Sequence, residues 1–102
     1  EQVANTIKLL KESPTPDGKN LLYHTVFLWA GELGDGGHHS FDGLQWIVGG
    51  GAGGQLQGGR FVNGAGKTNS DLFVSLGKLM GADMNTFGDP ACFTGPIAGI
   101  KA

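Results

Sequence analysis

The sequence predicts an α/β protein whose mostly parallel sheet is flanked by helices and connected by long glycine-rich loops. The main observation is the apolar run from Leu21 to Ala30, because near-continuous apolar residues are typical of a strand covered on both faces in a parallel sheet. This run leads directly into glycines, carboxylates and histidines. Open α/β sheets bind ligands beyond the carboxyl ends of such strands, so we expect a site there. Two amphipathic patterns elsewhere in the sequence predict the helices that this fold class requires.

The first helix pattern comes from Val3, Ile7 and Leu10, which recur at helical spacing between charged residues. The segment 13–18 contains two prolines and a glycine, so we expect a loop between this helix and the apolar strand. A second buried strand is expected at 44–48, which is short, aromatic and β-branched.

Glycines dominate the next part of the chain. Seven of the eleven residues from Gly49 to Gly59 are glycine, which predicts a turned loop, with a short strand at 60–62 beyond it. A second helix is predicted from Asn69 to Met80, capped by polar residues at its start and stopped by Gly81. The tail from Ala82 to Ala102 has little periodicity, and we expect irregular chain lying over a partner surface.

Length and composition narrow the class of protein. A chain of 102 residues allows one domain with a thin core, here a single partial domain spanning 1–102. A net charge of −2 gives no basic footprint for nucleic acid, and no apolar run has the length of a membrane span. The lone Cys92 excludes an internal disulfide framework. Because the chain starts inside a helical pattern, we expect a piece of a larger precursor.

Two segments resemble phosphate-binding motifs without their structural context. Gly49–Gly54 fits G-x-G-x-x-G after a strand, but 55–59 does not supply the helix whose amino end would hold a pyrophosphate. The segment 66–68 looks like the end of a nucleotide-binding loop, yet Phe61 stands where that loop requires glycine. Turn formation explains both segments.

The polar segment after the apolar strand carries the candidate chemistry. Oxygen and imidazole ligands lie within ten residues of each other, on backbone that glycine lets bend freely. A carboxylate and a neutral imidazole can share a zinc, manganese or iron ion, and calcium is not distinguished from these by the pattern. The alternative is that the acidic groups accept backbone hydrogen bonds in a glycine turn while the histidines are solvated.

Several motifs together resemble a known family. They are Thr25–Leu28, Gly31–Gly36, His39-Ser40, Ile47–Gly51, Gly58–Arg60, Asn69–Met80 and Phe87–Asp89. Over almost the whole chain, this pattern resembles the C-terminal portion of a secreted bacterial family known as domain of unknown function 1552. That family is a distant relative of the alkaline phosphatase and sulfatase superfamily. Its members usually carry an export signal, so the resemblance implies a secreted or periplasmic protein.

The resemblance implies a fold and a metal site. The fold would be the C-terminal fragment of an alkaline-phosphatase-like three-layer α/β fold, with one or two divalent metals at the strand ends. Glu32 and His39 would be metal ligands, and Asp35 would be a further ligand or would orient His39. The family commonly has His-Ser-His where this chain has His39-Ser40-Phe41, so a second imidazole would come from His38. Asp42 is a weaker candidate.

Three functions follow as hypotheses. The first is the C-terminal part of a metal-dependent hydrolase of phosphate or sulfate esters, inactive alone because the superfamily's nucleophile lies on earlier strands. A companion chain or the upstream part of the same precursor would supply that nucleophile. The second is a secreted, non-catalytic structural or binding protein with a degenerate site. The third is a binding module that wraps an anion in the backbone amides of Gly49 to Gly59.

Overall fold

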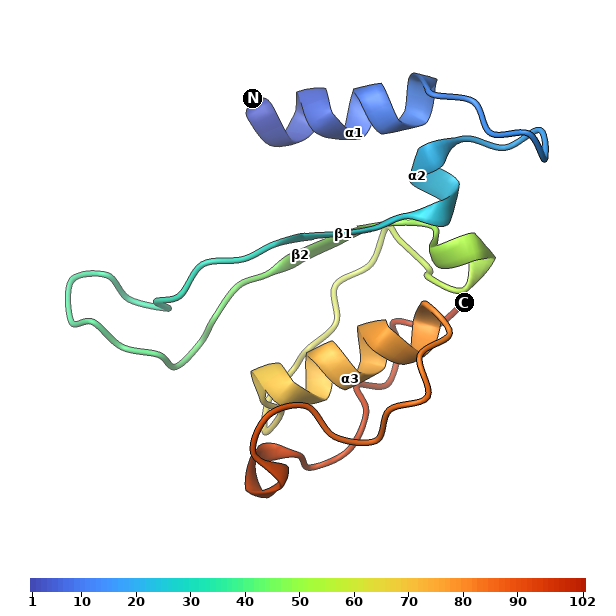
Figure 1. Cartoon of the computed structure of the whole chain (residues 1–102). Coiled ribbons are helices and arrows are strands. Elements are labelled where there is room, and N and C mark those ends of the chain that lie inside the picture. The colour runs from blue at the N-terminus through green and yellow to red at the C-terminus, as the bar shows by residue number, and fades with distance from the viewer.

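The structure, a computed structural model, describes residues 1–102 and contains three α-helices and one two-stranded sheet (Figure 1). In chain order the elements are α1 (Gln2–Glu12), α2 (Leu21–His24), β1 (Val26–Trp29), β2 (Ile47–Gly50), the 3₁₀ turn η1 (Ala52–Gly54), α3 (Asn69–Leu79) and the 3₁₀ turn η2 (Pro90–Cys92).

The predicted fold class is wrong: the sheet is antiparallel and has only two strands, so this is not a mostly parallel three-layer α/β fold. Parallel neighbours need a crossover connection, usually a helix, whereas the chain between Trp29 and Ile47 contains no helix and turns back directly. The strands pair as a hairpin, with Val26 opposite Gly50 and Trp29 opposite Ile47.

The apolar run divides into two elements rather than forming one strand. The Asn20 side chain accepts a hydrogen bond from the backbone N–H of Tyr23 at 2.9 Å, which caps the short helix α2. Only Val26–Trp29 remains extended. The second strand lies at Ile47–Gly50, a few residues later than predicted, and no strand forms at 60–62.

The core lies between the hairpin and α3. Its buried apolar residues are Ala52, Leu76, Leu79 and Ile100, against which Val26, Leu28 and Val48 pack. Because side chains alternate along a strand, the other residues of β1 point to the opposite face. Helix α1 lies on that opposite side of the hairpin (Figure 1), and none of its residues is buried.

Helix α3 confirms the predicted second helix. The Thr68 hydroxyl accepts a hydrogen bond from the backbone N–H of Asp71 at 3.2 Å, while the Asp71 carboxylate accepts one from the N–H of Thr68 at 2.9 Å. This reciprocal capping box satisfies two of the N–H groups that a helix start leaves unpaired. Gly81, with a φ of 85°, follows the end of the helix.

The tail packs against its own chain. Asp71, whose side chain is fully buried, also accepts hydrogen bonds from the N–H and hydroxyl of Thr94 and the N–H of Gly95, at 2.7 to 3.1 Å. The Ser75 hydroxyl accepts the N–H of Ile97 at 2.8 Å, and Ile100 enters the core. The tail is therefore held to α3 by hydrogen bonds and by the burial of Ile100.

Candidate metal-binding loop

The predicted site residues lie in the long loop between β1 and β2, which extends away from the core (Figure 1). An antiparallel bridge between Asp35 and Ser40 closes the tip of this loop. The N–H of Gly34 donates to the Ser40 carbonyl at 2.8 Å, and the N–H of Ser40 donates to the Asp35 carbonyl at 3.0 Å. We call residues 35–40 the loop tip.

Asp35 organises the loop tip. Its carboxylate lies 2.7 Å from Nδ1 of His38 and accepts the N–H of Gly37 at 2.8 Å. The hydrogen bond from the His38 ring, helped by the backbone N–H groups of Gly37 and His38, lowers the pKa of Asp35. When Nδ1 donates its proton to the carboxylate, Nε2 of His38 keeps a free lone pair. Carboxylate–imidazole pairs of this kind orient metal-binding histidines.

The partner of Asp35 differs from the one that the sequence suggested. We expected Asp35 to be a further metal ligand or to orient His39, and the structure pairs its carboxylate with His38, whose side chain is 86% exposed. The reason is local geometry, because a tight turn brings residues three apart together. His39 has a φ of 53°, a left-handed backbone conformation that is uncommon for residues other than glycine.

Glu32 and His39 are exposed and make no side-chain hydrogen bond, and Asp42 is also exposed. No group of three or more histidine, cysteine, aspartate or glutamate side chains lies close enough to hold a metal ion. Protein zinc sites use at least three protein ligands. The residues of this chain therefore do not form a complete metal site. The Asp35–His38 pair can supply only part of such a site.

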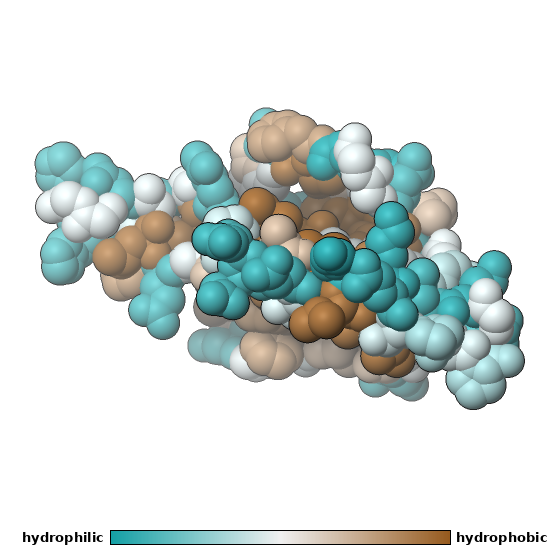
Figure 2. Space-filling model, turned by 90° about the horizontal axis from the view of Figure 1, so that it is seen from above, coloured by the Kyte–Doolittle hydropathy of each residue, from teal (hydrophilic) through white to brown (hydrophobic).

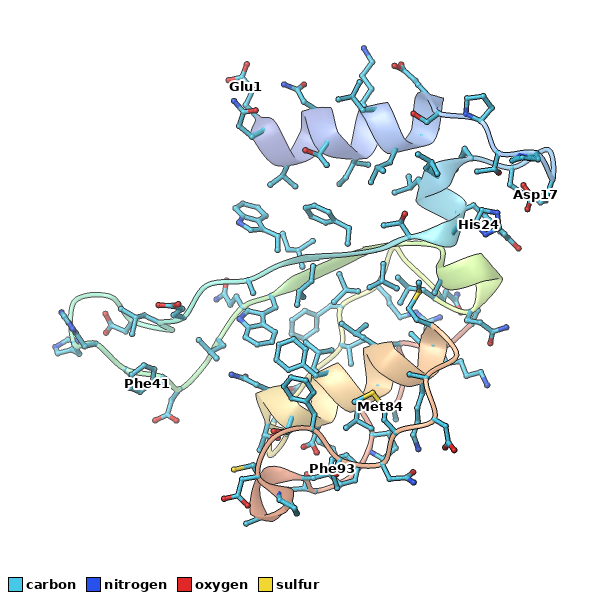
Figure 3. All side chains as sticks on the ribbon, in the orientation of Figure 1. Glu1, Asp17, His24, Phe41, Met84 and Phe93 are labelled. Atoms are coloured by element: carbon cyan, nitrogen blue, oxygen red, sulfur yellow. The ribbon has the colours of Figure 1, made fainter.

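A second carboxylate–imidazole pair was not predicted from the sequence. Nε2 of His24 lies 2.7 Å from the Asp17 carboxylate. A hydrogen bond from the Thr15 hydroxyl, with further ones from Lys19 and His24, lowers the pKa of Asp17 to about 2. Figure 3 shows Asp17 and His24 at the end of the molecule opposite Phe41, which lies in the β1–β2 loop. The proline-rich turn at 13–18 was the only sequence signal for this pair.

The glycine-rich segment does not present a free amide cradle. Its backbone N–H groups at residues 51, 52, 54, 55, 56 and 57 all donate to carbonyl groups of this chain. The glycines instead allow close backbone approach: a Cβ atom on Gly51 would lie 2.5 Å from the Tyr23 carbonyl oxygen, and one on Gly50 would lie 2.0 Å from the Thr25 carbonyl oxygen. The anion-binding hypothesis therefore loses its structural basis in this stretch.

Comparisons with family models, curated proteins and solved structures give no match for this chain. None of its helices is both long and apolar enough to cross a membrane.

Proposed function

We propose that this chain is the C-terminal part of a metal-dependent hydrolase-like protein acting on phosphate or sulfate esters, and that the loop tip contributes ligands to a divalent metal ion. The observation that carries the proposal is the Asp35–His38 pair, in which a carboxylate holds an exposed imidazole by Nδ1 and leaves Nε2 available. The family resemblance supports the same class of protein and a secreted or periplasmic location.

The residues have distinct roles in this proposal. His38 and His39 offer imidazole nitrogens, Glu32 offers carboxylate oxygens, and Asp35 positions His38. A bound divalent ion would polarise the ester as a Lewis acid. The nucleophile and the remaining ligands come from a companion chain or from an upstream part of the same precursor, because this chain has no group of three ligands.

A second function is a non-catalytic structural or binding role with a degenerate site. It is favoured by the lack of a three-ligand group and by large apolar side chains that remain exposed, among them Phe41, Phe61 and Trp29. Exposed apolar side chains mark a contact surface where they are contiguous, as Trp29 and Ile47 are across the hairpin. The two functions differ in whether the purified material carries a metal.

Native mass spectrometry combined with elemental analysis separates them, because it reports companion chains and bound metal together. The material is compared with its His38→Ala, His39→Ala and His24→Ala forms. We expect metal in the parent and at least about tenfold less in the two loop-tip variants, because losing a ligand or its orienting partner weakens binding by roughly that factor. His24→Ala is the matched control, since His24 also pairs with an aspartate but lies far from the loop tip.

The outcomes are distinct. A complex with a larger chain, with metal that depends on His38 and His39, supports the hydrolase proposal. Metal that is equally abundant in all four forms sinks the ligand assignment. Metal-free material favours the structural or binding role.

A further inference from the structure

The outer edge of β1 has no partner in this chain. The N–H of Gly51 donates to the Thr25 carbonyl at 3.0 Å, so Thr25 faces β2. In an antiparallel pair the alternate residues, Val26 and Leu28, direct their backbone groups to the other side. No backbone hydrogen bond outside the β1–β2 pair involves either residue. An apolar strand edge without proline or charge is a template for pairing with another chain, and an isolated two-stranded hairpin is marginally stable.

The hairpin face that points away from α3 is also incompletely covered. It carries the cross-strand pairs Phe27–Gly49 and Trp29–Ile47. Trp29 is 55% exposed and Ile47 is 54% exposed. Figure 2 looks down on this side of the molecule, with α1 toward the viewer, and shows brown apolar atoms exposed between teal polar ones. Helix α1 therefore shields this face only in part.

The surface area indicates how much the chain leaves uncovered. Its accessible surface is 6980 Å². A compact monomer of 10.5 kDa has about 5,400 Å², so the excess is about 1,500 Å². Obligate homodimers bury about 2,000 to 5,000 Å² in total, or roughly half of that on each chain. The excess falls within the range that one subunit of such a dimer buries, although the extended β1–β2 loop contributes part of it. The net charge of −2 gives little repulsion between two copies.

We propose that two copies of this chain associate through β1, antiparallel about a two-fold axis, to form a four-stranded sheet. The apolar faces of the two hairpins lie on the same side of the new sheet only when the two-fold axis passes through a residue pair, not between two pairs. Leu28 can form this central pair, because its backbone groups point away from β2. Leu28 then pairs with Leu28 of the partner subunit, and Phe27 meets Trp29 of the partner subunit. In this dimer the apolar faces of the two hairpins lie side by side. The association does not depend on the proposed metal site.

Sedimentation velocity from about 1 to 100 μM, in buffer containing a chelator, tests the dimer without involving metal. We expect twice the monomer mass of 10.5 kDa for the parent. Trp29→Lys and Ala30→Pro should each weaken association by at least about tenfold. The lysine puts a charge against the partner's aromatic face, and the proline removes an N–H that points away from β2. Phe61→Lys is the matched control, because Phe61 is 90% exposed and lies outside the sheet.

Circular dichroism establishes that each variant keeps the parent's secondary structure. A parent that stays monomeric at about 100 μM overturns the proposal. A dimer that persists in both Trp29→Lys and Ala30→Pro, which we call the β1-edge variants, also overturns it. Dissociation of the dimer by Phe61→Lys would do the same. Loss of the dimer in one β1-edge variant that keeps the fold, with the Phe61→Lys form still dimeric, is the supporting result.

Discussion

At the scale of single residues, the buried Asp71 carboxylate does most to join distant parts of the chain. Burial alone would raise the pKa of Asp71, but hydrogen bonds from the Thr68 N–H and from Thr94 and Gly95 outweigh it and hold the pKa well below its ordinary value of 3.8. One carboxylate thereby caps α3 and fixes the tail. A neutral side chain cannot accept all these bonds, because an amide has only one acceptor oxygen.

The low pKa of Asp71 makes stability depend on pH in the acid range. The unfolded chain binds a proton to Asp71 at a higher pH than the folded chain does, so its contribution is full above about pH 4 and is lost as the pH falls further. Urea unfolding at pH 7 and at pH 3 measures it. We expect Asp71→Asn to be less stable than the parent at pH 7 and to lose less stability between the two pH values. An equal loss in both proteins would contradict this role.

Two glycines of the same segment should differ in how strongly an added methyl group destabilises the fold. Gly51→Ala places a Cβ 2.5 Å from the Tyr23 carbonyl oxygen, and relieving that clash moves backbone. We expect a loss of about 1–3 kcal/mol in the free energy of unfolding, as for other overpacked sites. Gly49→Ala meets nothing within 4 Å and has no positive φ, so it should change stability by less than about 0.5 kcal/mol. Chemical denaturation compares the two, and equal effects would refute the close-approach argument.

At the scale of elements, α3 is the helix that both local sequence and tertiary contacts support. Its N-terminus has the capping box, and its apolar side carries Val74, Leu76 and Leu79 into the interior. Helix α1 has the periodicity without full burial, because the rest of the chain covers its apolar side only in part and none of its residues is buried. Amphipathic helices gain most of their stability from packing, so α1 is the less stable of the two.

The cap of α3 can be tested directly. Thr68→Ala removes the hydroxyl that accepts the Asp71 N–H and donates to the Cys92 carbonyl at 2.6 Å. We expect a loss of about 1 kcal/mol in the free energy of unfolding. Ser70→Ala lies two residues further along the same turn and removes no hydrogen bond of this chain, so it should stay within about 0.5 kcal/mol. A loss as large for Ser70→Ala as for Thr68→Ala would count against the cap.

At the scale of the whole molecule, the chain is extended and thinly cored. Its radius of gyration is 14.8 Å, whereas a compact chain of this length has about 13 Å. Seven of 102 residues are buried. The β1–β2 loop accounts for part of this extension. Within the loop, the Trp46 indole N–H donates to the Gly31 carbonyl at 2.8 Å. The loop contacts α3 through the Trp46 ring, which lies 5.8 Å from that of Phe73.

The loop tip should therefore be dispensable for folding. Replacing residues 35–40 with Asn-Gly should change the free energy of unfolding by less than about 0.5 kcal/mol, because the hydrogen bonds of the tip all stay within the β1–β2 loop and loop length has a weak entropic effect. Trp46→Ala should cost at least about 2 kcal/mol, because it removes the contact that anchors the loop to α3. Thermal or urea unfolding measures both. A large loss from the loop-tip replacement would show that the tip contacts the body.

Local signals in the sequence predicted the local structure well. The periodicity of residues 3–10 and 72–80 predicted both long helices, because helix spacing is a short-range property. The clustering of Asp35, His38 and His39 in one polar turn was likewise visible in the sequence. The pairing of Asp35 with His38 was not, since it depends on how the turn closes at Ser40.

The direction of the second strand was decided only by the tertiary structure. The apolar run and residues 44–48 were both predicted to be buried strands, and burial on two faces suggested parallel neighbours. In the structure those faces are covered by α3 on one side and partly by α1 on the other, although the strands are antiparallel (Figure 1). The sequence by itself determined where the two long helices form and where the polar loop lies, whereas the short helix α2 formed within the predicted strand. Strand direction, the junction made by Asp71 and the uncovered edge of β1 depend on contacts between residues far apart in the chain, which local patterns do not encode.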